Sequence, residues 1–414
     1  MNQPIRGLNP ARPKAVAAGA AGWLVVLVVS LFFIWGGVTS LNDILIPKLK
    51  GLFQLSYVEA MLVQLAFFTA YAVFSVPAGA LVARLGYGRG IVAGLVVMAA
   101  GCLLFVPAAS TALYGLFLGA LFILAAGITI LQVAANPLIA NLGAADTSHS
   151  RLTLAQAFNS LGTTIMPFIG ARLILGAAGR AVTGRSVEAA VIGRAYLGIA
   201  VILGVIGLVF WRSRRRLGEA DGAAGLSVGI DLLGRPRLAF GVAAIFLYVG
   251  AEVTIGSLLV SYLMQHSTLG LDQRSAGEMV PFYWGGAMTG RFAGAWLLRR
   301  VSPGKLLAIA AIVAGGLALL SASTTGALAG WSLIAIGLMN SIMFPTIFSL
   351  ALEGLGERTP QGSGLLCMAI VGGALVPLLG GWVADLSSLA MALTVPAVCY
   401  AVIASFGWFA RRPA

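Results

Sequence analysis

Three ionisable side chains occur inside long apolar stretches of this 414-residue chain. Glu252 lies well inside one stretch, Asp43 lies toward the end of another, and Arg291 lies inside a third. A charged group in a membrane-like environment is costly, and such a residue generally has a function. A carboxyl group there holds its proton more tightly than in water, and it can bind and release a proton, or bind a cation, near neutral pH. The chemistry that these residues favour is ion binding, with Asp43 as the first candidate and Glu252 as the second.

Each carboxyl group also has a purely structural interpretation. Glu252 could form a salt bridge with Arg291, which would make the arginine its interior charge partner and hold two neighbouring helices together. Asp43 could be a solvated acid at the end of a helix. The sequence alone leaves both interpretations open.

Neutral amide side chains occur on the same apolar stretches. Gln132 and Asn136 are four positions apart and Gln156 and Asn159 are three apart, so each pair lies on one face of a helix. An amide carries both a donor and an acceptor, which suits a ring of sugar hydroxyl groups, and an aromatic ring can stack on the sugar's C–H face. Hydrogen bonding between helices is the alternative role for any one amide. The residues predicted to bind a ligand are Asn42, Gln64, Gln132, Asn136, Gln156, Asn159, Tyr283, Trp284 and Asn340.

The composition requires a membrane environment for the elements that position these residues. The chain is 59% hydrophobic and only 9% charged, whereas soluble domains carry about 25% charged residues. A membrane-crossing helix needs about 20 mostly apolar residues. The breaks between apolar stretches predict an all-α membrane protein with twelve transmembrane helices, at 20–46, 58–83, 90–109, 112–140, 152–175, 191–211, 238–264, 279–298, 306–323, 327–351, 362–383 and 389–410.

The basic residues indicate the orientation of these spans. If the N-terminus lies in the cytoplasm, most of the 26 lysines and arginines fall in cytoplasmic segments, as the positive-inside rule requires. Both termini are therefore predicted to be cytoplasmic. The formal net charge of +13 then reflects membrane topology, and no interleaved basic and aromatic patch indicates nucleic-acid binding.

An enzyme is not indicated. The three cysteines, Cys102, Cys367 and Cys399, all lie in apolar stretches and are typical of packing residues. No nucleophile–base pair, metal-ligand cluster or phosphate-binding loop is visible. We expect no catalytic residues, no metal and no cofactor.

The chain also contains traces of an internal duplication. A Gly-x-x-x-x-Arg spacing at Gly79 and Arg84 recurs in the second half of the chain, as do a proline in span 4 and a Gly–Pro–Gly pattern in span 5. The three pairs occur in the same order at nearly the same separation, which predicts two related six-helix units. The predicted organisation is an N-terminal segment 1–19, a first half 20–211, a linker 212–237, a second half 238–410 and a tail 411–414.

Two parallel six-helix halves resemble the architecture of the major facilitator superfamily. The stretch from Gly79 through Arg84 to Arg89 resembles that superfamily's signature loop between helices 2 and 3, which implies a gating or topological role for these residues. The signature usually carries an acid just before its first basic residue, and here that position is Ala83. The departure puts the usual charge-locked gate in doubt.

Longer motifs resemble the fucose–galactose–glucose:proton symporter family, in its glucose/galactose branch. They cover about residues 25 to 385 and are found at 41–47, 132–137, 151–162, 248–253 and 340–348. The resemblance implies import of a neutral hexose, driven by an ion gradient, across a bacterial inner membrane. It implies that Asp43 is a functional carboxyl group and that Gln156 and Asn159 bind or position substrate. The family's helix-4 glutamate falls on Gln132, which cannot titrate, so Glu252 becomes the second candidate.

Our interpretation is a twelve-helix hexose symporter that works as a monomer in the lipid bilayer, with a sugar as substrate and a proton as the favoured co-substrate. Sodium is the main rival to the proton, because a carboxylate can bind either. Transport of another small polar solute, including export, is the second alternative.

Overall fold

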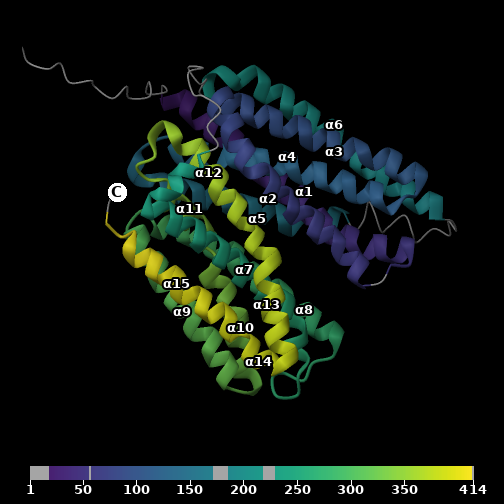
Figure 1. Ribbon diagram of the computed structural model, residues 1–414, viewed down its shortest axis with the longest axis vertical. Coiled ribbons are helices and arrows are strands. Elements are labelled where there is room, and N and C mark those ends of the chain that lie inside the picture. Colours follow the sequence, from purple (N-terminus) through teal and green to yellow (C-terminus); the bar gives the residue numbers. More distant parts are fainter. Residues whose placement is uncertain (1–17, 56, 171–184, 218–228, 413–414) are drawn as a thin grey trace, which may run out of the picture.

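The computed structural model describes residues 18–55, 57–170, 185–217 and 229–412, and every regular element in these ranges is helical (Figure 1). Within the described residues, 10 helical stretches are long and apolar enough to cross a membrane. Two further helices, α5 (Ser148–Gly170) and α8 (Gln273–Leu297), carry more polar residues, but they pack in the same bundle, against α1 and α10 respectively. The all-α fold with twelve membrane spans is therefore confirmed.

Each span of the first half is a single helix. The predicted spans agree with these helices to within a few residues at most ends. The fifth span was predicted to run to 175, whereas α5 ends at Gly170 and residues 171–184 lie outside the described part of the chain. The other five helices are α1 (Ala18–Phe53), α2 (Tyr57–Leu85), α3 (Tyr87–Thr111), α4 (Tyr114–Asn141) and α6 (Arg185–Ser213).

Three spans of the second half are broken, and proline explains two of the breaks. Proline lacks the N–H group that would bond the carbonyl four residues earlier. Pro345 thereby leaves the carbonyl of Ser341 without its helical donor. In the last span, Pro396 leaves the carbonyl of Ala392 without one. The helices of this half are α7 (Pro236–Met264), α8, α9 (Pro303–Ser323), α10 (Gly326–Asn340), α11 (Met343–Leu352), α12 (Thr359–Met368), η7 (Ala369–Val371), α13 (Gly372–Leu386), α14 (Leu389–Ala392) and α15 (Thr394–Phe409).

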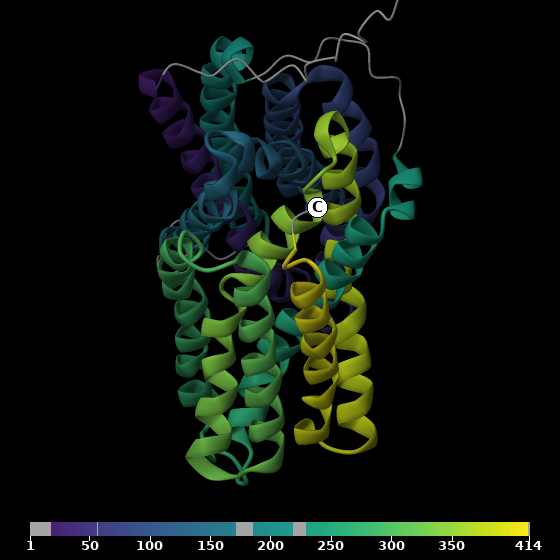
Figure 2. The ribbon, with the colours of Figure 1, turned by 90° about the vertical axis from the view of Figure 1, so that its left-hand side faces the viewer.

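The two halves lie at an angle to one another. They meet near α11 and α12 and diverge toward the opposite end (Figure 1). A view turned by 90° shows the first half above the second, with α12 reaching up to it (Figure 2). We call the end where they meet the contact end. It is formed by the N-terminus of α5, the C-terminal ends of α8 and α11, and the start of α12.

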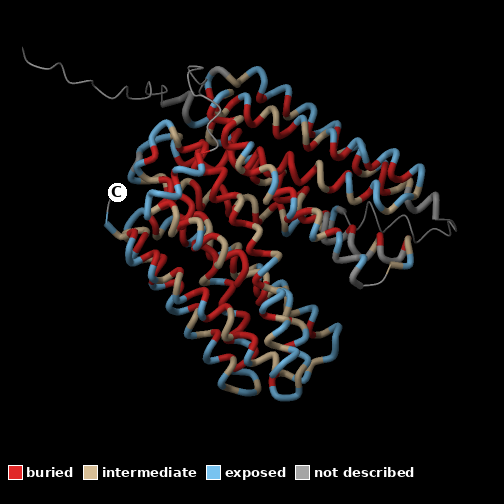
Figure 3. Tube along the Cα trace, viewed as in Figure 1, coloured by how far each residue is buried: buried red, intermediate tan, exposed pale blue. Residues whose placement is uncertain are grey.

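Buried residues run through the interior of both halves, and exposed residues follow the outer faces (Figure 3). Many of the exposed residues are large and apolar, as Val205 at 60%, Ile312 at 64% and Leu378 at 70% exposure illustrate. A water-soluble protein rarely exposes apolar surface on this scale. The outer faces therefore match a hydrocarbon environment.

Glycines allow the halves to approach closely at the contact end. A Cβ atom on Gly79 of α2 would lie 2.9 Å from the carbonyl oxygen of Pro360 in α12, and one on Gly364 would lie 2.6 Å from the carbonyl oxygen of Ser75. Small residues generally permit such backbone contact between membrane helices. Gly79, predicted to act in a gate, thus lies where the two halves touch.

The exact domain limits remain a prediction. The expected linker 212–237 contains two short helices, η4 (Arg214–Leu217) and η5 (Ile230–Gly234), and its residues 218–228 lie outside the described part of the chain.

Candidate functional site

A buried polar network in the second half surrounds Asn340, the last residue of α10. Asn340 Nδ2 donates to the hydroxyl of Tyr283 in α8 at 2.9 Å, and Tyr400 of α15 donates its hydroxyl to Asn340 Oδ1 at 2.8 Å. Tyr248 in α7 donates to Glu252 Oε1 at 2.8 Å. The three tyrosines and the asparagine are each at most 1% exposed. Four helices therefore hold one connected cluster, with Glu252 at its edge.

A second polar cluster lies in the first half, between α2, α4 and α5. Gln132 Nε2 donates to the hydroxyl of Tyr71 at 2.5 Å, and Gln156 Nε2 makes a long hydrogen bond of 3.4 Å to Asn136 Oδ1. The Nδ2 atom of Asn136 is buried and has no hydrogen-bond partner among the described residues. Because an unpaired buried donor is costly, this amide is a natural point for a ligand hydroxyl or a water to bind.

The two clusters repeat one device. In each half an amide on the fourth helix (Gln132 or Asn340) donates to a tyrosine hydroxyl on the second helix (Tyr71 or Tyr283). Such a correspondence is expected of two halves related by duplication. It also means that these amides are already held by protein groups, so each retains only part of its hydrogen-bonding capacity for a ligand.

Asn159 is held by a different contact. Its Nδ2 atom donates to the carbonyl of Phe32 in α1 at 3.0 Å. Gly36 permits this approach, because a Cβ atom there would lie 2.6 Å from the Asn159 amide nitrogen. The Asn159 side chain therefore joins α5 to α1 in this state.

Arg291 connects the two halves and makes no ion pair with Glu252, although its positive charge lies near enough to act on that carboxyl group. Its Nη1 atom donates to the hydroxyl of Ser160 in α5, and its Nε atom donates at 3.2 Å to the carbonyl of Ser341, which Pro345 leaves without a helical donor. Among the ion pairs of the described residues, none joins Arg291 to Glu252. The salt bridge expected as the structural interpretation of Glu252 is not formed, because the guanidinium group is taken by the break in the tenth span.

The other predicted binding residues are distributed as follows. Tyr283 is fully buried, so its ring face is not available for stacking, whereas Trp284 is 43% exposed and packs edge-on against it. Gln64 is partly buried in α2. Asn42 and Asp43 belong to α1, but their side chains lie outside the described part of the structure.

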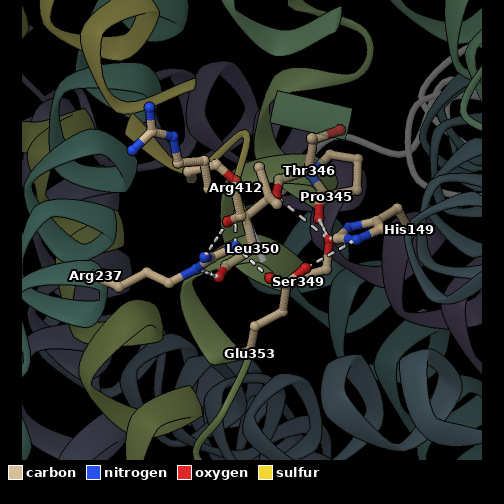
Figure 4. Close-up of polar contacts among 9 residues, drawn as sticks. His149, Arg237, Pro345, Thr346, Ser349, Leu350, Glu353 and Arg412 are labelled. Atoms are coloured by element: carbon tan, nitrogen blue, oxygen red, sulfur yellow. Dashed lines mark hydrogen bonds and ion pairs between the residues drawn. The ribbon is translucent and has the colours of Figure 1, made fainter. Parts of the chain in front are cut away.

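The contact end holds a cross-half network that the sequence did not point to (Figure 4). His149 of α5 places Nδ1 2.6 Å from Ser349 Oγ and Nε2 3.2 Å from Glu353 Oε1. Arg237 of α7 donates to the other Glu353 oxygen and, at 2.7 Å, to the carbonyl of Leu350. We call His149, Ser349, Glu353 and Arg237 the latch.

Further contacts close the same end. Ser150 donates to the carbonyl of Ala295 at 2.6 Å and accepts from Arg299 Nε at 3.1 Å, while Ser363 donates to the carbonyl of Val133 at 2.9 Å. Each of these bonds joins one half to the other. The described structure is therefore a state in which the halves are locked together at the contact end.

The predicted gate residues Arg84 and Arg89 are exposed at this end, at the turn between α2 and α3. The latch was not predicted from the sequence. Glu353 and Arg237 lie near the ends of spans, where charged residues are common, and His149 is a polar residue between two spans. The clustering of Ser148, His149 and Ser150 at the start of a helix was the only local signal.

Comparisons with known proteins agree with this architecture. Residues 24–370 match the model of the Major Facilitator Superfamily. A protein of Brucella abortus named glucose/galactose transporter is 50% identical over 400 residues, covering 96% of this chain and 97% of its own. The L-fucose-proton symporter of Escherichia coli is 35% identical over 417 residues, covering 94% and 93%. These relatives are transporters and not enzymes.

The solved structures lead to the same family. The transporter FucP, captured in the outward conformation, superposes with a TM-score of 0.84 at 34% identity, covering 94% of this chain and 99% of its own. The sequence motifs, the paired six-helix halves and the matched family model agree, and the chain belongs to the Major Facilitator Superfamily.

Proposed function

We propose that this protein imports a neutral hexose, such as glucose or galactose, together with a proton, by alternating access between its two halves. The observation that carries the proposal is the 50% identity, over nearly the whole chain, to a protein named glucose/galactose transporter. The 35% identity to a fucose–proton symporter supports the proton as co-substrate.

The sugar site proposed here lies between the halves and uses amides of the first half and an aromatic ring of the second. Asn136 offers an unpaired buried donor, and Gln156 is next to it through a long and therefore readily exchanged hydrogen bond. Gln132, Asn159 and Asn340 already donate to protein groups. We therefore assign direct sugar contacts first to Asn136 and Gln156, and stacking to the exposed ring of Trp284.

Asp43 and Glu252 are the proposed ion-coupling carboxyl groups. Glu252 is in contact with the polar cluster around Asn340 through Tyr248, so a change in its charge would reach an element at the interface of the halves. Gln132 occupies the position of the family's second carboxyl group and cannot take up a proton. A coupling scheme for this chain must therefore use Asp43, Glu252 or both.

The contact end is proposed to face the cytoplasm of a bacterial cell, with both termini on that side of the inner membrane. The basic residues favour this orientation. The described state is then outward-facing, in agreement with its similarity to FucP in the outward conformation. The transport unit is proposed to be one chain in the bilayer, because the site draws on both halves of a single chain.

Flux measurements in proteoliposomes test the proposal. Labelled glucose and galactose should accumulate when the outside is made acidic, and an imposed sodium gradient alone should not drive uptake. Asp43→Asn is expected to abolish uphill uptake while sugar exchange continues. Hexose flux that is absent under every gradient would reject sugar transport, and sodium-driven accumulation without a pH gradient would reject the proton.

Transport of another small polar solute is the remaining alternative. A thermal-shift screen of purified protein against hexoses, amino sugars and polyols separates these classes, because a ligand that binds only the folded state raises its melting temperature. Stabilisation by a polyol but not by any hexose would indicate that the substrate is a polyol and not a hexose.

A further inference from the structure

The tenth span is interrupted next to Glu252. Helix α10 ends at Asn340, α11 begins at Met343, and the freed backbone carbonyls at the break are bonded by side chains from other helices. Tyr248 lies 3.1 Å from the carbonyl oxygen of Asn340, and Arg291 donates to that of Ser341. Unwound backbone at membrane depth requires such partners. Two side chains therefore stabilise the backbone at the break, and one of them, Tyr248, also touches a carboxyl group.

Tyr248 has one hydroxyl hydrogen and two acceptors within reach. Glu252 Oε1 lies at 2.8 Å and the Asn340 carbonyl oxygen at 3.1 Å. The ring is 1% exposed and packs against Phe344 just beyond the break. Because the buried ring is fixed, only the hydroxyl hydrogen is free to change direction.

The protonation state of Glu252 decides which acceptor receives that hydrogen. An ionised Glu252 only accepts, and a hydrogen bond to a charged group is stronger than one to a carbonyl, so the hydroxyl points at the carboxylate. A protonated Glu252 donates its own hydrogen to the tyrosine oxygen, and the tyrosine hydrogen turns to the Asn340 carbonyl. No proton passes between Glu252 and Tyr248 in either state, and only the direction of the tyrosine hydroxyl differs between the two.

The two sides of the break are anchored differently. The Asn340 side chain is held by Tyr283 and Tyr400, which fixes the end of α10. Helix α11 leads to Ser349 and then to Glu353, both of which contact His149 in the other half. A bond gained or lost at the Asn340 carbonyl therefore acts on the element that carries the latch.

We propose that Tyr248 is a positioning residue that reports the protonation of Glu252 to the break between α10 and α11, and through α11 to the contact between the halves. The proposal rests on the coupling role proposed above for Glu252. It assigns to the hydroxyl group a task that a merely structural tyrosine would not have, namely the pH dependence of the conformational change.

Tyr248→Phe removes the hydroxyl and keeps the buried ring. Tyr262→Phe is a matched control, because Tyr262 is another buried tyrosine of α7 whose hydroxyl donates to a backbone carbonyl, that of Ser321 at 2.6 Å. Among the described residues its hydroxyl bonds only Ser321 and no carboxyl group. Proton-driven accumulation and sugar exchange are measured in proteoliposomes between pH 5.5 and 8.5. We expect Tyr248→Phe to lower accumulation about tenfold, the equivalent of one charge-assisted hydrogen bond, to flatten its pH profile, and to leave exchange largely intact.

Glu252→Gln, measured alongside, separates the coupling role of Glu252 from the positioning role of Tyr248. If Glu252→Gln keeps the normal pH profile, the coupling role of Glu252 fails and the task of Tyr248 with it. If Glu252→Gln loses the profile but Tyr248→Phe keeps it, or if Tyr262→Phe flattens it equally, only the Tyr248 proposal is overturned.

A second measurement does not depend on the stability of the tyrosine variant. A spin-label distance between Asn141 and Glu357, which are exposed in the two halves at the contact end, should respond to pH in a His149→Gln background, which keeps a hydrogen-bonding side chain in the latch but removes its ionisable ring. It should stay at its low-pH value at all pH when that background also carries Glu252→Gln, whose amide can donate to Tyr248 as a protonated carboxyl group does. A distance that responds to pH equally in both chains would overturn the proposal.

Discussion

Removal of the latch histidine should open the contact end. His149 makes two contacts across the halves, one with Ser349 and one with Glu353 (Figure 4). The side chain of His149 is 9% exposed and that of Glu353 is 32% exposed, so the second contact is partly screened by solvent. Together we expect them to stabilise the closed contact end by about 2 kcal/mol, and His149→Ala should shift the equilibrium roughly 30-fold toward the open state.

The assay is the spin-label distance between Asn141 and Glu357 in detergent or nanodiscs. A longer-distance population should grow in His149→Ala, and apparent affinity for sugar added from the outside should weaken as the competent state becomes rarer. Asp231→Asn is the control, because it breaks a bidentate ion pair with Arg358 that lies at the same end but within one half. An unchanged distance distribution and affinity in His149→Ala would refute the reasoning.

The remaining predictions concern the interface of the halves. Gly79→Val should prevent closure of the contact end and abolish transport, because a Cβ atom there would lie 2.9 Å from the carbonyl oxygen of Pro360. Gly381→Val is the control and should transport normally, because no atom lies within 4 Å of a Cβ added at Gly381. Comparable flux in the two variants would contradict the role of close approach. Arg291→Lys keeps the charge but cannot reach both Ser160 and the Ser341 carbonyl, so uptake should fall about tenfold, and wild-type uptake would show that charge alone suffices.

The sequence determined the spans, the duplication and the positions of the interior charges. In a hydrocarbon environment each backbone group must be bonded within its own segment, so a long apolar stretch such as 87–111 can be read as a helix without knowledge of its neighbours. The family motifs could be recognised in the same local way, and so could Glu252 and Arg291, which are charged residues inside apolar stretches. The breaks near Pro345 and Pro396 could not be predicted in this way, because Pro77, Pro137 and Pro281 lie inside unbroken helices.

Only the tertiary structure decided which side chains meet. Whether Arg291 faces Glu252 or Ser160 depends on the rotation and depth of three helices, and those are set by packing between residues far apart in the chain. The same holds for the pairing of Gln132 with Tyr71 and for the latch, where His149 finds Glu353 some two hundred positions away. Span prediction uses backbone hydrogen bonding, which is local, whereas the site and its gate depend on non-local contacts that a single sequence does not encode in readable form.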